Sequence, residues 1–237
     1  MSVVWHDLEC GAYTADIALW RSLAEEHGDP VLDVGAGTGR IALDLARRGH
    51  RVTALDHDPM LVGELECRAE GLDLAAVIAD ARDFELDERF SLVIVPMQTI
   101  QLLGGADERR RFLTCARRHL REGGVLAIAI TEHLELFQAT EDGPLPMPDI
   151  REIDGVVYAS QPTAIREDHD GFVLERRRER IDPGGERTSE EDVIHLDRLS
   201  AGTLEQEARG AALRPAGRSS IPATADHVGS VVVMLRG

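Results

Sequence analysis

Three glycines and one acid at close spacing are the residues best suited to bind a ligand in this 237-residue chain. The glycines stand within residues 35–39 in the order G-x-G-x-G, directly after the apolar run 31–34, which contains Asp33. Glycines at this spacing let the backbone turn sharply and approach a ligand with no side chain in the way. Apolar residues then recur at helical spacing over 41–46. The stretch therefore predicts a strand, a tight loop and a helix whose free amide groups attract an acceptor or a carboxylate.

Further polar residues follow the later strands that the sequence predicts. Asp56 comes 21 residues after Gly35, close to the spacing at which an acid reaches a ribose in nucleotide-binding sheets. Asp80 and the pair Met97-Gln98 follow the next two apolar runs. Ligands of parallel sheets lie beyond the carboxyl ends of the strands. We therefore expect these residues and the glycine loop to converge on one crevice that fits an adenosine.

Apolar runs alternate with segments of helical period from residue 31 to residue 131, which predicts a parallel, doubly wound sheet. The expected strands of this sheet are 31–34, 51–55, 74–78, 90–95 and 125–131. The expected helices are 14–27, 39–48, 107–120 and 203–212, with a further helix starting at Asp58-Pro59. Strands at 216–221 and 229–235 are expected to close the sheet antiparallel. The predicted fold class is α/β, with a mostly parallel seven-stranded sheet and an antiparallel closing hairpin.

The segment after residue 131 predicts a small added antiparallel β sheet. Its expected elements are a loop at 141–148 and long strands at 155–168, 171–182 and 186–199. The arginine-rich run 176–180 suggests either nucleic-acid binding or charge pairing across a hairpin that turns at a Pro-Gly pair. A two-residue loop sets Arg177 opposite Glu190, whereas a three-residue loop sets Arg180 opposite Glu186. Both registers give more opposite-charge than like-charge pairs, so sheet pairing is favoured and the register stays open.

Charge and cysteine content argue against several classes of function. The net charge of −17 argues against a nucleic-acid partner, because phosphate binding needs a basic face. Cys10, Cys67 and Cys115 lack C-x-x-C spacing, so neither a metal site nor a disulfide framework is expected. The sequence shows no secretory signal and no apolar run of about 18 residues, so no membrane segment is expected. A cytoplasmic location is the expectation.

The stretch VLDVGAGTGR resembles motif I of the class I S-adenosylmethionine-dependent methyltransferases. More narrowly, the chain resembles the small-molecule N-methyltransferases, those of amino sugars and, more distantly, of glycine. This likeness rests on an amino-terminal segment with a tyrosine, a methionine-led segment after 90–95, the pattern E-x-x-x-x-F at 132–137, and the added antiparallel strands. It implies a Rossmann-like fold, S-adenosylmethionine as cofactor with S-adenosylhomocysteine as product, and a small-molecule methyl acceptor, with an amine expected.

The resemblance also assigns roles to residues. Tyr13 and Trp20 would cover the methionine part of the cofactor, since an aromatic face attracts a sulfonium cation; packing of a helix is the stronger expectation for Trp20. Asp80 would accept a hydrogen bond from the adenine amine, and His57 would pack near the nucleoside or be exposed. The full set of expected cofactor-binding residues is Tyr13, Trp20, Asp33, Gly35, Ala36, Gly37, Gly39, Asp56, His57, Asp80, Ala81 and Met97. The candidates for positioning the acceptor are Gln98, Glu132, His133 and His195.

The chain is expected to form a single methyltransferase domain, and a homodimer is one expected assembly. Its expected parts are an amino-terminal lid and helix at 1–30, a cofactor-binding core at 31–131, a substrate-side β elaboration at 132–200, and a helix with closing strands at 201–237. Two other functions stay open. The protein could bind S-adenosylmethionine without catalysis, or it could be a nicotinamide-dependent oxidoreductase. Arg40 disfavours the second, because it stands where a dinucleotide fingerprint has its last glycine.

Overall fold

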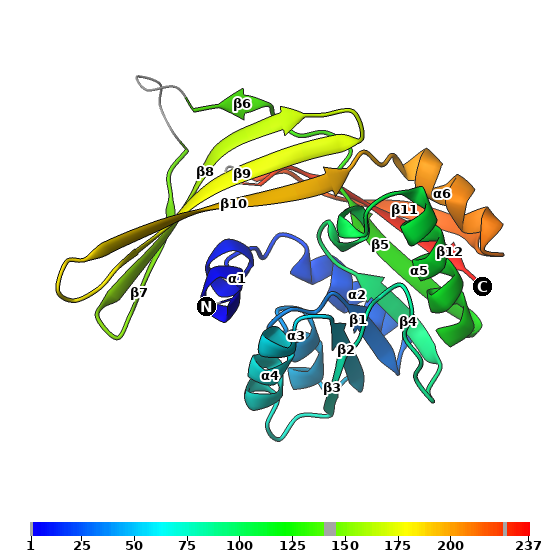
Figure 1. Ribbon diagram of the computed structural model, residues 1–237. Coiled ribbons are helices and arrows are strands. Elements are labelled where there is room, and N and C mark those ends of the chain that lie inside the picture. The colour runs from blue at the N-terminus through cyan, green and yellow to red at the C-terminus, as the bar shows by residue number, and fades with distance from the viewer. Residues whose placement is uncertain (1, 140–145, 225–226) are drawn as a thin grey trace. The chain divides into compact units, whose positions relative to one another are not determined.

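The computed structural model describes residues 2–139, 146–224 and 227–237 (Figure 1). The chain divides into two compact units. The larger unit combines Tyr13–Glu132 with Leu199–Gly237, and the smaller unit combines Met1–Ala12 with His133–Arg198. The segment 1–30 is therefore shared between the two units.

A seven-stranded sheet forms the centre of the larger unit, with the strand order β11-β12-β5-β4-β1-β2-β3. Its strands are β1 (Val31–Val34), β2 (Val52–Asp56), β3 (Leu74–Ile78), β4 (Phe90–Val95), β5 (Leu120–Ile130), β11 (Arg214–Ile221) and β12 (Ser230–Arg236). The five strands from β1 to β5 are parallel, and β12 runs antiparallel to both β5 and β11. This confirms the predicted fold class.

The strand order places a topological switch point at β1. From β1 the chain moves outward to β2 and β3 on one side, and it then returns to form β4 on the other side of β1. Open α/β sheets bind their ligands at this point, beyond the carboxyl ends of the strands. The glycine loop begins directly at the end of β1.

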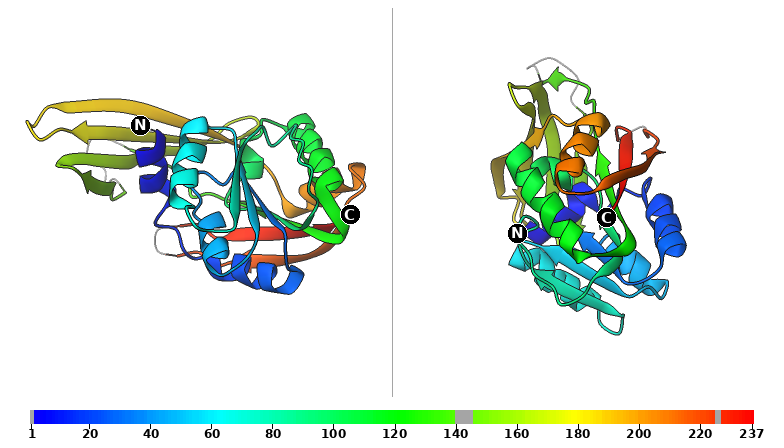
Figure 2. Two further views of the ribbon diagram at one scale, coloured as in Figure 1. Left: turned by 90° about the horizontal axis from the view of Figure 1, so that it is seen from below. Right: turned by 90° about the vertical axis from the view of Figure 1, so that its right-hand side faces the viewer.

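Helices cover both faces of this sheet (Figure 1). They are α2 (Ile17–His27), α3 (Ala42–Arg47), α4 (Pro59–Arg68), the 3-10 helix η1 (Thr99–Leu102), α5 (Ala106–His119) and α6 (Ala201–Gly210). The buried residues form two clusters, one with side chains of α5 and α6 and the other with side chains of α2, α3 and α4. Figure 2 shows α2 and α5 on opposite sides of the sheet.

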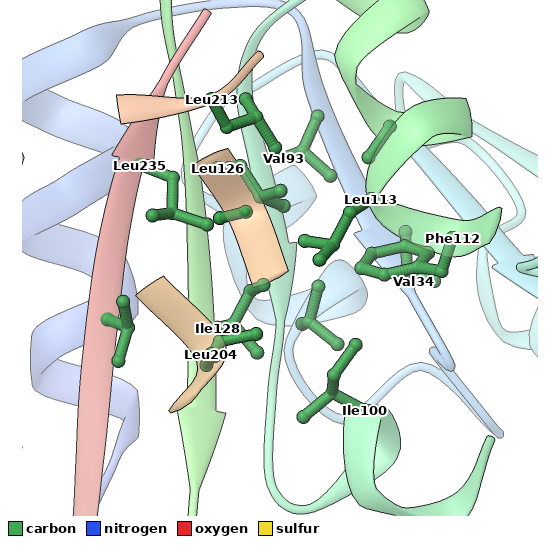
Figure 3. Packing of buried hydrophobic residues seen from close by; sticks show 14 of the residues in the cluster. Val34, Val93, Ile100, Phe112, Leu113, Leu126, Ile128, Leu204, Leu213 and Leu235 are labelled. Carbon is green, nitrogen blue, oxygen red and sulfur yellow. The ribbon is translucent and has the colours of Figure 1, made fainter. Parts of the chain in front are cut away.

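The two clusters share the strands by strict alternation. In β5, Leu126 and Ile128 belong to the cluster with α5 and α6, while Ala127 and Ala129 belong to the cluster with α2. Successive side chains of a strand point to opposite faces, so a strand buried on both faces is apolar throughout. Figure 3 shows Leu126 next to Val93 and Ile128 next to Leu204 in the first cluster.

The smaller unit contains a second, antiparallel sheet with the order β10-β9-β8-β6, in which β7 also pairs with β8. Its strands are β6 (Phe137–Gln138), β7 (Asp149–Ile153), β8 (Val156–Glu167), β9 (Gly171–Ile181) and β10 (Arg187–Asp197). The three long strands confirm the predicted sheet, whereas β6, β7 and the helix α1 (Ser2–Cys10) were not predicted. Of the loop expected at 141–148, residues 141–145 lie outside the described residues.

The arginine-rich run pairs with an acidic strand, but in neither of the two predicted registers. Arg178 lies opposite Glu190, and Arg176 lies opposite Asp192. The register follows from a longer connection, because the last pair of the ladder joins Ile181 to Arg187. The side chain of Asp182 stabilises this connection by accepting hydrogen bonds from the backbone N–H groups of residues 184 and 186, each at 2.9 Å.

Candidate functional site

The glycine loop has a backbone that only glycine adopts readily at three positions. Gly35, Gly37 and Gly39 have φ angles of 74°, 56° and 93°. A Cβ atom at Gly35 would lie 2.4 Å from Thr99 Cγ2, and one at Gly39 would lie 2.3 Å from Leu65 Cδ1. The loop therefore combines left-handed geometry with tight packing, and its surface toward a ligand is backbone.

The loop is fastened to the end of β2 by backbone and carboxylate acceptors. The N–H groups of Gly35 and Ala36 donate to the carbonyl oxygen of Leu55 at 2.8 and 3.0 Å. Gly37 N–H donates to Asp56 Oδ2 at 2.8 Å. The acid predicted for a ribose and the loop predicted for close backbone approach are thus in direct contact.

Asp56 is 7% exposed, and its second oxygen, Oδ1, accepts from the N–H of Asp58 at 3.0 Å. His57 is exposed, with Nδ1 3.3 Å from Asp56 Oδ1. The side chain of Asp58 accepts from Met60 N–H at 2.8 Å and caps α4, with Pro59 as the first helical residue. The two nearby acids therefore differ in role, since Asp58 starts the helix while Asp56 faces the loop.

Asp33 lies in β1, two residues before the glycine loop, and is 1% exposed. Its Oδ1 has no hydrogen-bond partner. Burial raises the pKa of Asp33 to about 7, against the opposing effect of the Arg40 guanidinium. A buried acceptor without a partner is costly, and at a strand end beside a glycine loop it indicates a place for a polar ligand group.

Arg40, directly after the loop, ties it to the segment before α2. Its guanidinium donates to Asp16 Oδ1 and Oδ2 at 2.6 and 2.7 Å and to the carbonyl oxygen of Tyr13 at 2.8 Å. Asp16 is fully buried. Sequence reasoning missed this pair, because its partners are 24 residues apart and neither stands in a recognisable pattern.

The two expected aromatic residues differ in their surroundings. Trp20 is fully buried in the core cluster of α2, and its Nε1–H donates to Asp16 Oδ2 at 2.9 Å. Its indole therefore packs α2 onto the sheet, which was the stronger expectation. Tyr13 is 7% exposed, with its ring centre 4.8 Å from that of His227 and 5.2 Å from the guanidinium carbon of Arg40.

Asp80 and Ala81 follow β3 at the same edge of the sheet. The Asp80 carboxylate is half-exposed and accepts hydrogen bonds from Arg82 Nε and Nη2 at 2.6–3.1 Å. The Arg82 side chain lowers the pKa of Asp80 to about 2, so this residue is an ionised acceptor throughout the neutral range. Its protonation state fits the expected contact with an amine.

The segment after β4 has a strained backbone and tethered amides. Met97 has a φ of 55°, which is uncommon for a residue other than glycine and typical of functional loops. Gln98 Nε2 donates to Thr131 Oγ1 at 2.9 Å. Gln101 is buried and exchanges two hydrogen bonds with the Thr131 backbone, at 2.8 and 3.0 Å. The ends of β4 and β5 are thereby joined, by a residue that sequence analysis did not single out.

The four candidates for positioning the acceptor do not belong to one unit. Glu132 lies in the larger unit with Gln98, and its Oε1 accepts from the N–H of Ala201 at 2.7 Å, which caps the first turn of α6. His133 and His195 belong to the smaller unit and are exposed. His195 Nδ1 is 3.8 Å from Asp168 Oδ2. The larger unit alone thus contains the glycine loop, Met97, Gln98 and the acids Asp33, Asp56 and Asp80.

Among the described residues there is no group of three or more histidines, cysteines, aspartates or glutamates that could hold a metal ion. In the same part of the chain, the helices are all too short or too polar to cross a membrane.

Comparison with known proteins identifies the domain at this site. The family described as a methyltransferase domain matches residues 31–124. The cypemycin N-terminal methyltransferase of a Streptomyces species is 34% identical over 115 residues, which are 48% of this chain and 47% of that protein. The S-adenosyl-L-methionine-dependent Diels-Alderase iccD of Talaromyces variabilis is 30% identical over 158 residues, 63% of this chain and 51% of that protein. The matches thus span about half the length of these relatives.

Solved structures share the fold over almost the whole chain. CalS10, an amino pentose methyltransferase from Micromonospora echinaspora, has a TM-score of 0.72 and 21% identity, and the match covers 100% of this chain and 98% of CalS10. The sugar N-methyltransferase KedS8 from Streptoalloteichus has a TM-score of 0.72 and 20% identity, covering 99% of this chain and 92% of KedS8. Residues 31–124 therefore carry a methyltransferase domain, and the sheet order with its glycine loop at the switch point is the Rossmann-like fold that the matched methyltransferase structures share.

Proposed function

We propose that this protein transfers the methyl group of S-adenosylmethionine to an amine of a small molecule. One observation carries the proposal: the left-handed glycine loop at the switch point of the sheet is in hydrogen-bond contact with Asp56 at the end of β2. A loop with no side chain at three of its positions, beside a carboxylate, suits the ribose and methionine parts of an adenosyl cofactor.

The residues around the loop fit this cofactor. Asp56 would accept hydrogen bonds from the ribose hydroxyl groups, and Asp80, which is ionised and half-exposed, would accept one from the adenine amine. Asp33 has a buried oxygen without a partner, which a polar group of the cofactor would satisfy. Tyr13 offers an aromatic ring next to the loop-anchoring Arg40. When bound, the cofactor supplies an electrophilic methyl group on a positively charged sulfur.

The protein's own contribution to methyl transfer is positioning. In-line displacement requires the acceptor nitrogen, the methyl carbon and the sulfur to lie on one line, and such alignment can lower a barrier by roughly 7–11 kcal/mol. The strained turn at Met97 and the tethered amide of Gln98 stand at the end of β4, next to the switch point. We assign Gln98 to hold the acceptor, and we expect its amide to orient the attacking amine.

Three considerations favour an amine over a hydroxyl group. A hydroxyl acceptor needs a base, whereas an amine can lose its proton to solvent before it binds. At the end of β5 the nearest acid, Glu132, is occupied in capping α6. The names of the cypemycin, amino pentose and sugar relatives describe methyl transfer to an amino terminus, an amino sugar or a nitrogen.

Binding and transfer are tested in sequence on the full chain. Isothermal titration with S-adenosylhomocysteine should show saturable binding, and NAD should show none; the reverse result would favour an oxidoreductase. Methyl-labelled S-adenosylmethionine is then offered with matched acceptors, an amino sugar and the same sugar with a hydroxyl group in place of the amine. Label transfer to the amino sugar alone supports the proposal, and transfer to the hydroxyl sugar alone overturns the amine assignment.

A second candidate function follows from one of the relatives. The similarity to an S-adenosyl-L-methionine-dependent Diels-Alderase favours the alternative that the cofactor is bound without methyl transfer. Tight binding of S-adenosylhomocysteine with no label transfer to a panel of amines and hydroxyl compounds would support this second function. The native mass of the same preparation tests the expected homodimer.

A further inference from the structure

Arg40 is more buried than arginine residues usually are, and its guanidinium has several partners. Its side chain is 11% exposed, and it forms a two-pronged pair with Asp16, whose side chain is fully buried. The same guanidinium donates to the backbone carbonyl of Tyr13 and lies 5.2 Å from the centre of the Tyr13 ring. Paired N–H···O bonds between arginine and a carboxylate fix geometry as well as charge. Arg40 therefore fixes where Tyr13 lies relative to the glycine loop.

Arg40 is also the cation that balances a group of buried acids. The charges of Arg40, Asp56 and Asp16 all act on the buried carboxyl group of Asp33. The three carboxylates are each less than 10% exposed. Burial and the two neighbouring acids raise the pKa of Asp33, and Arg40 lowers it. Two histidines contact the edge of this group, His57 at Asp56 and His227 at the ring of Tyr13.

We propose that Arg40 is a positioning residue for the cofactor: it ties Tyr13 and Asp16 to the end of the glycine loop, and its charge offsets that of the buried acids beside it. The inference rests on the proposed function, since it assigns how the same adenosyl site is prepared for a positively charged ligand. It predicts two separable contributions of Arg40, one from the two-pronged geometry and one from the charge.

Substitutions at the two ends of the pair separate these contributions. Arg40→Met removes both the charge and the geometry, Arg40→Lys keeps the charge, and Asp16→Asn breaks the ion pair while leaving Arg40 charged. The dissociation constant for S-adenosylhomocysteine is measured by calorimetry from about pH 6 to about pH 8.5, the range in which Asp33 titrates. Circular dichroism and thermal unfolding verify that each variant is folded.

A matched control comes from the middle of α2. Arg21 forms a similar two-pronged pair with Asp44, at 2.8 and 2.6 Å, and joins α2 to α3 without contacting the loop. Arg21→Met should therefore bind S-adenosylhomocysteine like the wild type. If it weakens binding as much as Arg40→Met does, Arg40 acts only through the packing of α2 and the inference is wrong.

The expected outcomes are distinct. Arg40→Met should bind roughly tenfold more weakly at pH 7 or worse, and its pH midpoint of binding should move upward, because Asp33 then holds its proton to higher pH. Arg40→Lys and Asp16→Asn should also weaken binding, but without an upward shift of that midpoint. If Arg40→Met does not fold, these two variants still test the geometric contribution. Binding within twofold of the wild type in all three would overturn the inference, whereas no binding by the wild type would overturn the proposed function itself.

Discussion

At the scale of single residues, the acids at the ends of β1 and β3 have pKa values shifted in opposite directions. Asp33 is buried beside other carboxylates, and its pKa is raised to about 7. Asp80 is half-exposed beside Arg82, and its pKa is lowered to about 2. A buried group with a shifted pKa and no partner for one oxygen is characteristic of a binding site rather than of a core. One of the buried side-chain atoms that the structure leaves without a hydrogen-bond partner thus belongs to the residue just ahead of the glycine loop.

Asp33→Asn should change how stability depends on pH. Because the folded pKa of Asp33 lies above its ordinary value of 3.8, the folded state keeps a proton that the unfolded chain releases. The cost of ionising this group therefore grows as pH rises from about 4 to about 7 and is constant above that. The variant should gain free energy of unfolding relative to wild type over this range, up to about 4 kcal/mol.

Urea denaturation of both proteins at several pH values measures this difference. Asp44→Asn is the matched control, because hydrogen bonding to Arg21 lowers the pKa of Asp44 and reverses the sign. Asp44→Asn should lose stability relative to wild type as pH rises through the acid range. A stability difference for Asp33→Asn that does not change with pH would contradict the assigned state of Asp33.

Asp56→Ala should weaken cofactor binding by roughly 1–3 kcal/mol, because the ribose hydroxyl groups and the N–H of Gly37 lose their shared acceptor. Titration with S-adenosylhomocysteine measures the effect. Asp58→Asn is the control, since Asp58 caps α4 and asparagine caps a helix equally well. Equal affinity in the Asp56 variant and wild type would place the ribose contact elsewhere.

At the scale of helices and strands, the sequence predicts elements with a periodic apolar pattern and misses elements that depend on contacts with residues far along the chain. The five parallel strands were predicted because their side chains are apolar on both faces of the sheet, as Val93 and Ile94 of β4 show by packing into different clusters. The loop was predicted from the spacing of its glycines. Helix α1 was missed because it buries only Trp5 and Leu8 and depends on partners far along the chain. The hairpin register was wrong because the Asp182 side chain stabilises a longer turn than charge pairing alone suggests.

The residues of the candidate site also fall into those that the sequence predicts and those that it does not. The glycine loop and the acids at the strand ends are local patterns, so Asp56 was predicted from its spacing to Gly35 and Asp80 from its place at the end of a predicted strand. Other bonds around the site join residues far apart in the chain, such as Arg40 with Asp16 and Gln101 with Thr131, and no pattern in one sequence reveals them.

Gln98 and Gln101 both bond to Thr131 after the end of β5, but we expect different roles for them: Gln101 stabilises the fold and Gln98 holds the acceptor. Gln101→Leu should lower the free energy of unfolding by about 2 kcal/mol, because the N–H and the carbonyl group of Thr131 lose their buried partners. Gln98→Ala removes one partly buried hydrogen bond and should cost less than about 1 kcal/mol. If Gln98 holds the acceptor, its variant should instead raise the KM for that acceptor with little change in cofactor affinity. Urea denaturation and steady-state kinetics compare the two; an unchanged acceptor KM in Gln98→Ala would exclude the assigned role.

At the scale of the whole molecule, three crossings of the chain join the two units, between residues 12 and 13, 132 and 133, and 198 and 199. Each unit has its own stabilising contacts. The smaller unit holds α1 by charge: Glu9 accepts two hydrogen bonds from Arg178 at 2.7 Å and one from Ser160 at 2.7 Å. The guanidinium of Arg178 also lies 5.6 Å from the ring centre of Trp5. Arg176 and Arg178 of the arginine-rich run thus hold the amino-terminal helix.

This arrangement predicts a local opening of α1 in acid. Burial raises the pKa of Glu9, but hydrogen bonds from Arg178 and Ser160 and the charge of Arg176 outweigh burial and hold it below the ordinary value of 4.5. The stabilisation by Glu9 is therefore complete above about pH 4.5 and is lost as pH falls through the lowered folded-state pKa. Hydrogen exchange of the α1 amides should accelerate over that acid range, whereas Arg178→Met should show fast exchange of α1 already at neutral pH.

Hydrogen exchange with peptide resolution tests both statements in one experiment. Because the contacts of Glu9 and Arg178 lie within the smaller unit, amides of the central strands β1 and β4 should stay protected in Arg178→Met. Arg198→Met is the control, since Arg198 stacks on Phe172 in the same unit at an exposed position and has no contact with α1. Loss of protection in β1 or β4 together with α1 would mean that the molecule unfolds as one cooperative body, and the charge cluster at Glu9 would then be a support of the whole fold rather than of α1 alone.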